Sequence, residues 1–186
     1  MAIINSLCVG AGHAATGKGA SGAVGYINES DEARNIRNCV VFFNALGKKK
    51  KIVDCTVDKG TQSGVLTKAV KIANNSNCDA NIQIHFNASK KSAKDGKAKG
   101  VEALVYTYGF NKSTEIAQHL TKEISEKLGI PNRGVKERKT LYFLRKTKKP
   151  AVILECCFCD DEDDYIAYRK EDGAIKCAVA ILNLLE

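Results

Sequence analysis

The chain has 186 residues, of which 44% are hydrophobic and 27% are charged, which suits one soluble globular domain with a substantial core. No apolar run approaches the ~20 residues that a membrane helix requires, so we expect no membrane association. The formal net charge of +8 and the pI of about 9.0 favour an anionic partner.

The first half of the chain is predicted to open with a strand, a loop and a helix. The apolar run at residues 3–9 predicts a first strand, and since it lacks the basic segment of a signal peptide, we expect synthesis in the cytoplasm. Residues 10–26 are rich in Gly, Ala and Ser, which is typical of a loop. Apolar side chains at helical spacing predict a helix at residues 30–46. A strand, a helix and a strand are expected next, at residues 51–57, 61–77 and 79–86.

The second half begins with a polar, lysine-rich stretch at residues 87–100, which we expect to be a loop. Alternating apolar residues predict a strand at 101–108. Ile116, Leu120 and Ile124 lie at helical spacing, which predicts a helix at 112–128. Two short strands, the start of a short helix and a final amphipathic helix are expected at residues 141–144, 151–154, 160–164 and 174–185.

This alternation of strands and helices indicates an α/β fold. It favours a twisted, mostly parallel sheet of about six strands with helices on both faces. The sequence contains no internal repeat and no interdomain linker, so residues 1–186 are expected to form a single domain.

Eight cysteines raise the question of a disulfide framework. The length of the chain and the expected cytoplasmic synthesis argue against one, because cytosolic thiols stay reduced. The segment Cys156-Cys157-Phe158-Cys159 contains a CxxC spacing. It follows a late strand and precedes an acidic run, so a redox or second zinc role is disfavoured. The other thiols in apolar patterns are expected to be small core residues, namely Cys39, Cys55, Cys78 and Cys177.

Four polar residues mark a candidate site. His13, His85 and Glu155 each lie at or just after the end of an apolar strand, and Glu29 opens a helix. In an open α/β sheet, strand ends and helix starts converge on one crevice where ligands bind. Two imidazoles and a carboxylate are the ligand set of a catalytic zinc, and a further carboxylate can accept a proton from water.

Each assignment has a competing interpretation. Asp31 and Glu32 compete with Glu29 as the carboxylate ligand, because all three can be favourable first-turn charges on a helix. Glu155 can instead form a buried salt bridge with an arginine, the candidates being Arg133, Arg138 and Arg145. The third histidine, His119, lies in the middle of a predicted helix and is interpreted as a surface residue.

Several motifs in order along the chain resemble the zinc-dependent N-acetylmuramoyl-L-alanine amidases of the amidase-3 type, which occur in phage endolysins and bacterial autolysins. The resemblance covers nearly the whole chain from about residue 3. It rests on Gly10-Ala11-Gly12-His13, Asn28-Glu29-Ser30-Asp31, Gln83-Ile84-His85-Phe86-Asn87-Ala88 and Ile153-Leu154-Glu155. Arg133-Gly134-Val135-Lys136 and Leu141-Tyr142-Phe143-Leu144-Arg145 also resemble the family's segment before its last catalytic strand.

The resemblance implies a catalytic domain that hydrolyses the amide between N-acetylmuramic acid and L-alanine in peptidoglycan. It implies that His13, Glu29 and His85 hold one Zn²⁺ ion. Glu155 would take the proton of the attacking water and return it to the departing amine. The family often has a strand followed by Asp-Pro-Gly-His-Gly-Gly where this chain has Val9-Gly10-Ala11-Gly12-His13-Ala14-Ala15. It usually has Thr-Gly or Ser-Gly where this chain has Cys156-Cys157. These departures concern substrate fit and local polar contacts more than metal binding.

Peptidoglycan is therefore the expected partner, with anionic wall polymers as a second. Residues 1–186 leave no room for a separate wall-binding domain, and attraction between the basic surface and the wall would partly replace one. The chain is expected to act on the wall after release from the cytoplasm. Nucleic acid is disfavoured, because the lysine clusters lack interleaved aromatic residues.

Three alternatives remain open at this point. The chain could be another zinc amide hydrolase acting on peptidoglycan, such as a carboxypeptidase. It could be a non-catalytic basic module that binds walls without a metal. Its charge alone would also permit a nucleic-acid binder.

Overall fold

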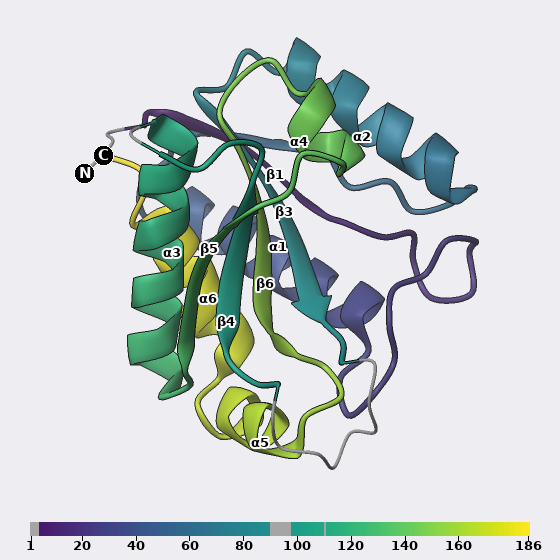
Figure 1. Cartoon of the computed structure of the whole chain (residues 1–186). Coiled ribbons are helices and arrows are strands. Elements are labelled where there is room, and N and C mark those ends of the chain that lie inside the picture. The colour runs from purple at the N-terminus through teal and green to yellow at the C-terminus, as the bar shows by residue number, and fades with distance from the viewer. Residues whose placement is uncertain (1–3, 90–97, 110) are drawn as a thin grey trace.

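A computed structural model describes residues 4–89, 98–109 and 111–186, and within these ranges the chain forms six strands and six helices (Figure 1). The strands are β1 (Ser6–Ala11), β2 (Lys51–Asp54), β3 (Ala80–Asn87), β4 (Val101–Val105), β5 (Asn132–Glu137) and β6 (Ala151–Phe158). The helices are α1 (Glu29–Leu46), α2 (Gln62–Asn75), α3 (Lys112–Leu128), α4 (Tyr142–Lys146), α5 (Glu162–Lys170) and α6 (Gly173–Leu182). None of these helices is long and apolar enough to cross a bilayer.

The strands form one sheet in the order β2-β1-β3-β6-β4-β5. Neighbouring strands run parallel except for β4, which pairs antiparallel with β6 and parallel with β5. The predicted α/β fold with a mostly parallel sheet is confirmed. Strands β1, β3 and β6 occupy the middle of the sheet, so their carboxyl ends meet at one edge, where parallel sheets bind ligands.

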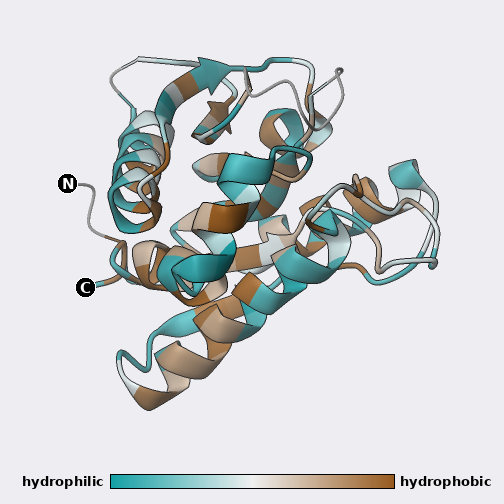
Figure 2. Ribbon diagram, turned by 90° about the horizontal axis from the view of Figure 1, so that it is seen from below, coloured by the Kyte–Doolittle hydropathy of each residue, from teal (hydrophilic) through white to brown (hydrophobic). Residues whose placement is uncertain are grey.

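Helices cover both faces of the sheet, as predicted. The larger core packs α1, α3 and α6 against one face, and the smaller core packs α2 and α4 against the other. The helices carry both apolar and polar bands, which Figure 2 shows in brown and teal. Strand β3 sends Ile82 and Ile84 into the larger core, so the period of two sends Gln83 and His85 toward the face covered by α2 and α4.

The structure corrects two predicted elements near the end of the chain. Residues 141–144 were expected to be a strand but open helix α4, whose Phe143 and Leu144 are buried in the smaller core. A short apolar run fits a strand or a buried helix equally well, so packing decides between them. Strand β5 was not predicted, because none of its residues is fully buried and it lies at the edge of the sheet.

Other boundaries differ by a few residues. The first strand begins at Ser6 rather than at residue 3, which lies outside the described residues. Strands β2 and β4 end three residues earlier than predicted. Most of the expected loop at 87–100 also lies outside the described residues, at positions 90–97.

All eight cysteines are free thiols. Cys55, Cys78 and Cys177 are buried as expected, whereas Cys39 is half-buried. In the CxxC segment, burial and the neighbouring Asp160 charge raise the pKa of Cys159 to about 12. A protonated, buried thiol is a poor nucleophile. That a redox or second zinc role is disfavoured for this segment stays a prediction.

Candidate metal centre and active site

Three side chains from distant parts of the chain converge at the carboxyl edge of the sheet. His13 follows the end of β1, Glu29 is the first residue of α1, and His85 lies near the end of β3. Glu29 Oε1 lies 3.3 Å from His13 Nε2 and 3.0 Å from His85 Nδ1. The two imidazole rings meet edge to face at a centroid separation of 4.9 Å. The structure thus brings together the three residues that the sequence predicted as metal ligands.

The Glu29 carboxylate is buried and held on both oxygens. Its Oε2 accepts a hydrogen bond from the Ala23 backbone at 2.8 Å, and its Oε1 accepts one from the Phe86 backbone at 3.1 Å. Burial opposes the ionised form of Glu29, but hydrogen bonds from His13 and His85 outweigh it and hold its pKa far below the ordinary value. The carboxylate is therefore charged and fixed in direction.

These three residues fit a divalent metal ion. One ligand atom from each side chain lies within 4.8 Å of the others, and this is the one such group of three or more among the described residues. Two nitrogens and one carboxylate oxygen are the donors that catalytic zinc sites use while keeping another position open. A cation would also balance the buried negative charge of Glu29. Without a cation, the two imidazoles stabilise that charge only through ring N–H groups that point at the carboxylate.

The two competing carboxylates on α1 have other partners. Asp31 accepts a hydrogen bond from Thr16 Oγ1 at 2.7 Å. Glu32 accepts one from the Tyr168 hydroxyl at 3.1 Å and pairs with Arg169 at 3.2 Å. Glu29 is therefore the α1 carboxylate that faces the histidines.

Glu155 lies beside this cluster on the neighbouring strand. It is directly opposite His85 in the parallel pairing of β3 and β6, so the two side chains share one face of the sheet. Burial raises the pKa of Glu155 to about 7. Among the described residues, no Lys or Arg nitrogen lies within ion-pair distance of Glu155, so it does not form the salt bridge considered as the alternative.

Glu102 is a buried carboxylate that the sequence did not reveal. It pairs with Arg133, one of the arginines considered as partners of Glu155. Glu102 is opposite Glu155 in the pairing of β4 and β6 and is 5% exposed. Arg133 Nε lies 2.7 Å from Glu102 Oε2, and the Lys136 ammonium contacts the same oxygen. Although burial opposes it, these two cations lower the pKa of Glu102. The alternation in the sequence suggested a polar outer face, and only the pairing with β6 shows that Glu102 is buried.

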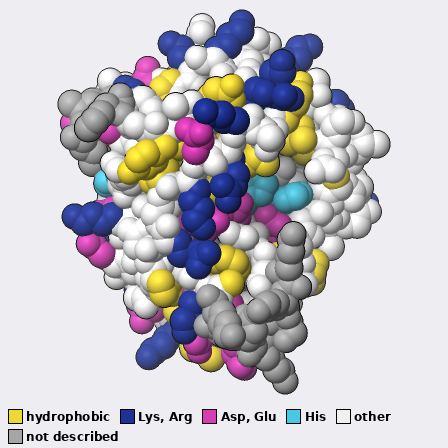
Figure 3. All heavy atoms as spheres, viewed as in Figure 1, with side chains coloured by type: hydrophobic (Ala, Val, Ile, Leu, Met, Phe, Trp, Pro, Cys, Tyr) yellow, Lys and Arg dark blue, Asp and Glu magenta, His cyan; other side chains and the backbone are white. Residues whose placement is uncertain are grey.

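On the face of the molecule that Figure 3 shows, histidine side chains lie beside acidic side chains and a column of Lys and Arg side chains. His85, Glu155 and Glu102 follow one another across β3, β6 and β4. Glu155, the carboxyl group of this row whose pKa is raised, lies between the histidine and the charge-paired Glu102. This arrangement suits it for holding and moving a proton.

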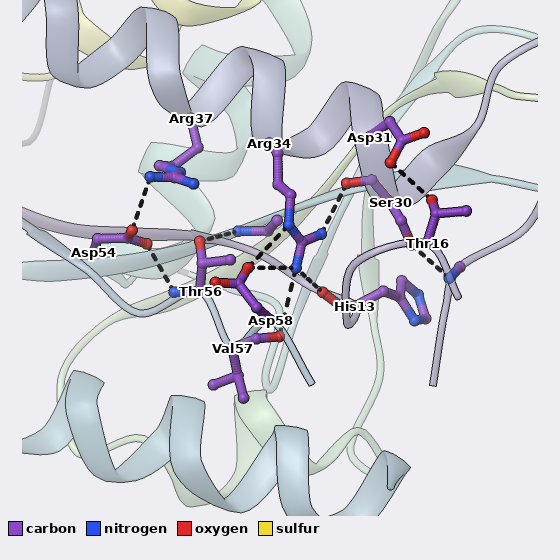
Figure 4. A network of polar contacts seen from close by, with 12 residues as sticks. His13, Thr16, Ser30, Asp31, Arg34, Arg37, Asp54, Thr56, Val57 and Asp58 are labelled. Carbon is purple, nitrogen blue, oxygen red and sulfur yellow. Dashed lines mark hydrogen bonds and ion pairs between the residues drawn. The ribbon is translucent and has the colours of Figure 1, made fainter. Parts of the chain in front are cut away.

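Arg34 is a second residue that the sequence analysis missed. Its guanidinium donates to the His13 carbonyl at 2.9 Å, to the Ser30 carbonyl at 2.8 Å and to Asp58 Oδ1 at 3.1 Å (Figure 4). These contacts tie the His13 loop to α1 and to the segment after β2. The sequence gives no signal for such a role of a helical arginine, because the partners of Arg34 are mostly backbone carbonyls.

His119 takes no part in this cluster. It was interpreted as a surface residue, but it is half-buried on α3, and burial lowers its pKa. The helix α3 packs against α6, which covers part of the imidazole. His119 is therefore a matched control for the two site histidines.

An apolar cavity of about 240 Å³ adjoins the cluster of His13, Glu29 and His85. His13, His85 and Gln83 form one part of its wall, and residues of α2, α4 and β6 form most of the rest. The sequence analysis did not predict this cavity, because α4 was expected to be a strand. A substrate that reaches His13 and His85 can therefore place an apolar group in this cavity.

Gly12 permits the close approach of the His85 ring. A Cβ atom at Gly12 would lie 1.8 Å from His85 Nε2, far inside contact distance. We expect Gly12→Ala to displace the ring and to reduce zinc affinity by about 10–100-fold, as losses of supporting contacts around metal ligands do. Competition for zinc with a chromophoric chelator measures this. Gly47→Ala at the end of α1 is the control, because its φ of −113° suits alanine and a Cβ there meets only the Phe43 carbonyl oxygen at 3.4 Å. Equal zinc affinity in the Gly12 variant and the wild type would contradict the expectation.

The raised pKa of Glu155 predicts how the stability of the metal-free protein depends on pH. The ordinary pKa of 4.5 rises to about 7 on folding, so between these values the folded state holds a proton that the unfolded state has lost. Folding stability should therefore fall as the pH rises from about 4.5 to 7, by up to roughly 3 kcal/mol. The raised pKa of His85, where the Glu29 and Glu155 charges outweigh burial, acts in the same direction. Thermal unfolding against pH should show a smaller slope for Glu155→Gln, and equal slopes would rule out this titration.

Comparisons with solved structures agree with the fold and its layers. The structure matches the catalytic domain of the CD27L endolysin, which targets Clostridia difficile, with a TM-score of 0.77 and 27% identity, covering 97% of this chain and 98% of that chain. It also matches an N-acetylmuramoyl-L-alanine amidase from Clostridium difficile 630 with a TM-score of 0.79 and 24% identity, covering 97% and 95% of the two chains.

Two curated relatives come from Clostridium perfringens. An uncharacterized protein of strain 13 is 32% identical over 154 residues, and an uncharacterized 38.4 kDa protein is 36% identical over 152 residues. Each alignment covers 82% of this chain but only 44% and 43% of the respective relatives, so the chain spans less than half their length. The profile of the Amidase_3 family, described as N-acetylmuramoyl-L-alanine amidase, matches residues 7–186, and the chain belongs to that family.

Proposed function

We propose that this chain hydrolyses the amide bond between N-acetylmuramic acid and L-alanine in peptidoglycan and so lyses cell walls. The convergence of His13, Glu29 and His85 within 4.8 Å, in a chain of the Amidase_3 family, is the observation that carries the proposal. These three residues would hold one zinc ion. Glu155, opposite His85 in the sheet, would be the catalytic residue that moves the proton.

When bound, zinc supplies Lewis acidity toward water and toward the carbonyl of the scissile amide. The remaining chemistry belongs to the chain. The ionised Glu155 carboxylate takes a proton from the attacking water as the new C–O bond forms. It then gives that proton to the departing alanine nitrogen as the C–N bond breaks, which leaves Glu155 as it began. A pKa of about 7 suits both halves of this cycle at neutral pH.

Other residues keep this proton transfer in place. In the chain without a metal, Glu29 orients His85 through the 3.0 Å contact, and two backbone amides fix Glu29 itself. Arg133 and Lys136 form ion pairs with Glu102, the other carboxylate beside Glu155. These ion pairs keep Glu102 ionised, so that it does not compete with Glu155 for the proton. Glu155 is thereby left as the carboxyl group that can exchange a proton near the cluster.

Identification of the new product end tests the proposal against its nearest alternative. Purified peptidoglycan incubated with the chain should gain N-terminal alanine, which amine labelling and mass spectrometry detect. A carboxypeptidase would instead release a free amino acid from the end of the stem peptide. A wall-binding module would sediment with the walls and release neither product. Each alternative outcome rejects the amidase proposal.

The charge of the chain supports a further part of the proposal, attraction to anionic wall polymers. With a formal net charge of +8, sedimentation with walls should weaken as salt is raised. Walls stripped of their anionic polymers should retain less of the chain at low salt, and equal retention would reject the attraction. Retention on DNA at moderate salt would favour nucleic acid instead. Synthesis in the cytoplasm and action after release stay proposals, which fractionation of producing cells tests.

A further inference from the structure

Gln83 is a buried amide whose polar atoms are not used by the fold. It lies two residues before His85 on the same face of β3 and is 1% exposed. Its Nε2 has no hydrogen-bond partner among the described residues. Its cross-strand neighbours are Gly10 on β1 and Ile153 on β6, which offer no polar side chain. The Nε2 group of Gln83 is therefore buried without a hydrogen-bond partner from the fold.

Gln83 faces the apolar cavity beside the cluster of His13, Glu29 and His85. Gln83 lies in its wall with His85, and the other walls include Val65 on α2, Phe143 on α4 and Ile153 on β6. A buried amide without a partner costs free energy, whereas an apolar side chain of the same size would not. A polar group that destabilises the fold but faces a binding cavity has the properties of a specificity-determining residue.

We propose that Gln83 recognises an amide group of the substrate inside this cavity, through hydrogen bonds that its carboxamide both donates and accepts. The proposal rests on the proposed amidase function. An amide needs one acceptor and one donor opposite it, which a single glutamine supplies. The apolar walls would cover the carbon atoms beside that amide, and a methyl group suits their size and character.

Two parts of the substrate share this chemistry. The N-acetyl group of muramic acid is a methyl group joined to an amide. The stem peptide beyond the scissile bond also presents amides next to the alanine methyl group. Both adjoin the bond that is cleaved, so either can reach a cavity whose wall includes His13 and His85.

The first test compares Gln83→Met with the wild type on a soluble N-acetylmuramoyl tripeptide. KM should rise about 10-fold or more with kcat within about 3-fold, because the lost contact serves ground state and transition state alike. Zinc content should be unchanged, and the melting temperature without substrate should be equal or higher, because an unpartnered amide has been removed. Gln83→Leu repeats the test with a second apolar residue in case the methionine variant fails to fold.

Asn81 offers a matched control on the same face of β3. It is also 1% exposed, and its Oδ1 likewise has no partner among the described residues, but it does not line the cavity and its Nδ2 donates to the Pro150 carbonyl at 3.3 Å. Asn81→Leu removes a buried amide of the same strand outside the cavity and should leave KM unchanged. Gln83 variants with an unchanged KM, or with a lowered melting temperature as their main effect, would overturn the proposal.

Two further substrates identify which amide is bound. If Gln83 binds the N-acetyl group, a muramoyl tripeptide without that group should show equal KM values in the wild type and Gln83→Met. If Gln83 binds the stem, the difference should persist on that substrate and vanish when the tripeptide is shortened to alanine alone. A difference that survives both changes would overturn the proposal. Failure of the wild type to cleave any of these substrates would instead reject the amidase function itself.

Discussion

Replacing Glu155 with Gln should lower the turnover number by about 10²–10⁴-fold while the protein keeps its zinc. Glutamine has nearly the same shape as a protonated glutamate, so the sheet and the neighbouring His85 should stay in place. It cannot take up a proton at neutral pH, however, and the attacking water and the departing amine both lose their proton-transfer partner. Rates of hydrolysis on a soluble muramoyl peptide, with zinc measured on the same samples, test this expectation.

The exposed Glu126 on α3 provides the matched control. Glu126→Gln makes the same chemical change away from the site and should leave both turnover and zinc unaltered. If Glu155→Gln hydrolyses the peptide at the wild-type rate with its zinc retained, Glu155 is not the catalytic carboxylate. Loss of zinc from Glu155→Gln would likewise contradict the account, because Glu155 would then act as a ligand.

The second large effect concerns the histidines. His13→Ala and His85→Ala should each reduce zinc affinity by more than about 100-fold, because losing a ligand should exceed the 10–100-fold cost of losing its supporting contacts. Each variant leaves Glu29 with one imidazole fewer at about 3 Å. Zinc remaining after dialysis against a competing chelator measures the loss.

His119→Ala tests whether the effect is specific to those two rings. It removes the third histidine of the chain, which is half-buried on α3 outside the cluster, and should leave the zinc content at the wild-type level. An undiminished zinc content in His13→Ala or His85→Ala would show that the ligand set is wrong. Equal losses in all three variants would point to unfolding instead.

Much of the site is visible in the sequence because strand ends and helix starts have local signals. Apolar runs end at His85 and Glu155, and the first-turn charges around Glu29 mark a helix start. Those signals predict the fold class and the family, and the structure and the comparisons confirm both. That residues 1–186 form one catalytic domain without a wall-binding domain stays a prediction.

The rest depends on contacts between distant segments. Nothing local in β4 indicates that it pairs antiparallel with β6, which is what buries Glu102 beside Glu155. The apolar run around Phe143 is too short for its periodicity to distinguish a buried strand from the helix α4 that forms there. The cavity follows from the position of α4, so the open amide of Gln83 could not be recognised before the structure was known.

The most direct test of the central claim is the release of N-terminal alanine from purified peptidoglycan with and without a metal chelator. The account predicts release by the untreated chain, none after chelation, and recovery when zinc is added back. Release that is unaffected by chelation would contradict the zinc site at His13, Glu29 and His85. The absence of any new N-terminal alanine from a zinc-loaded chain would contradict the amidase function.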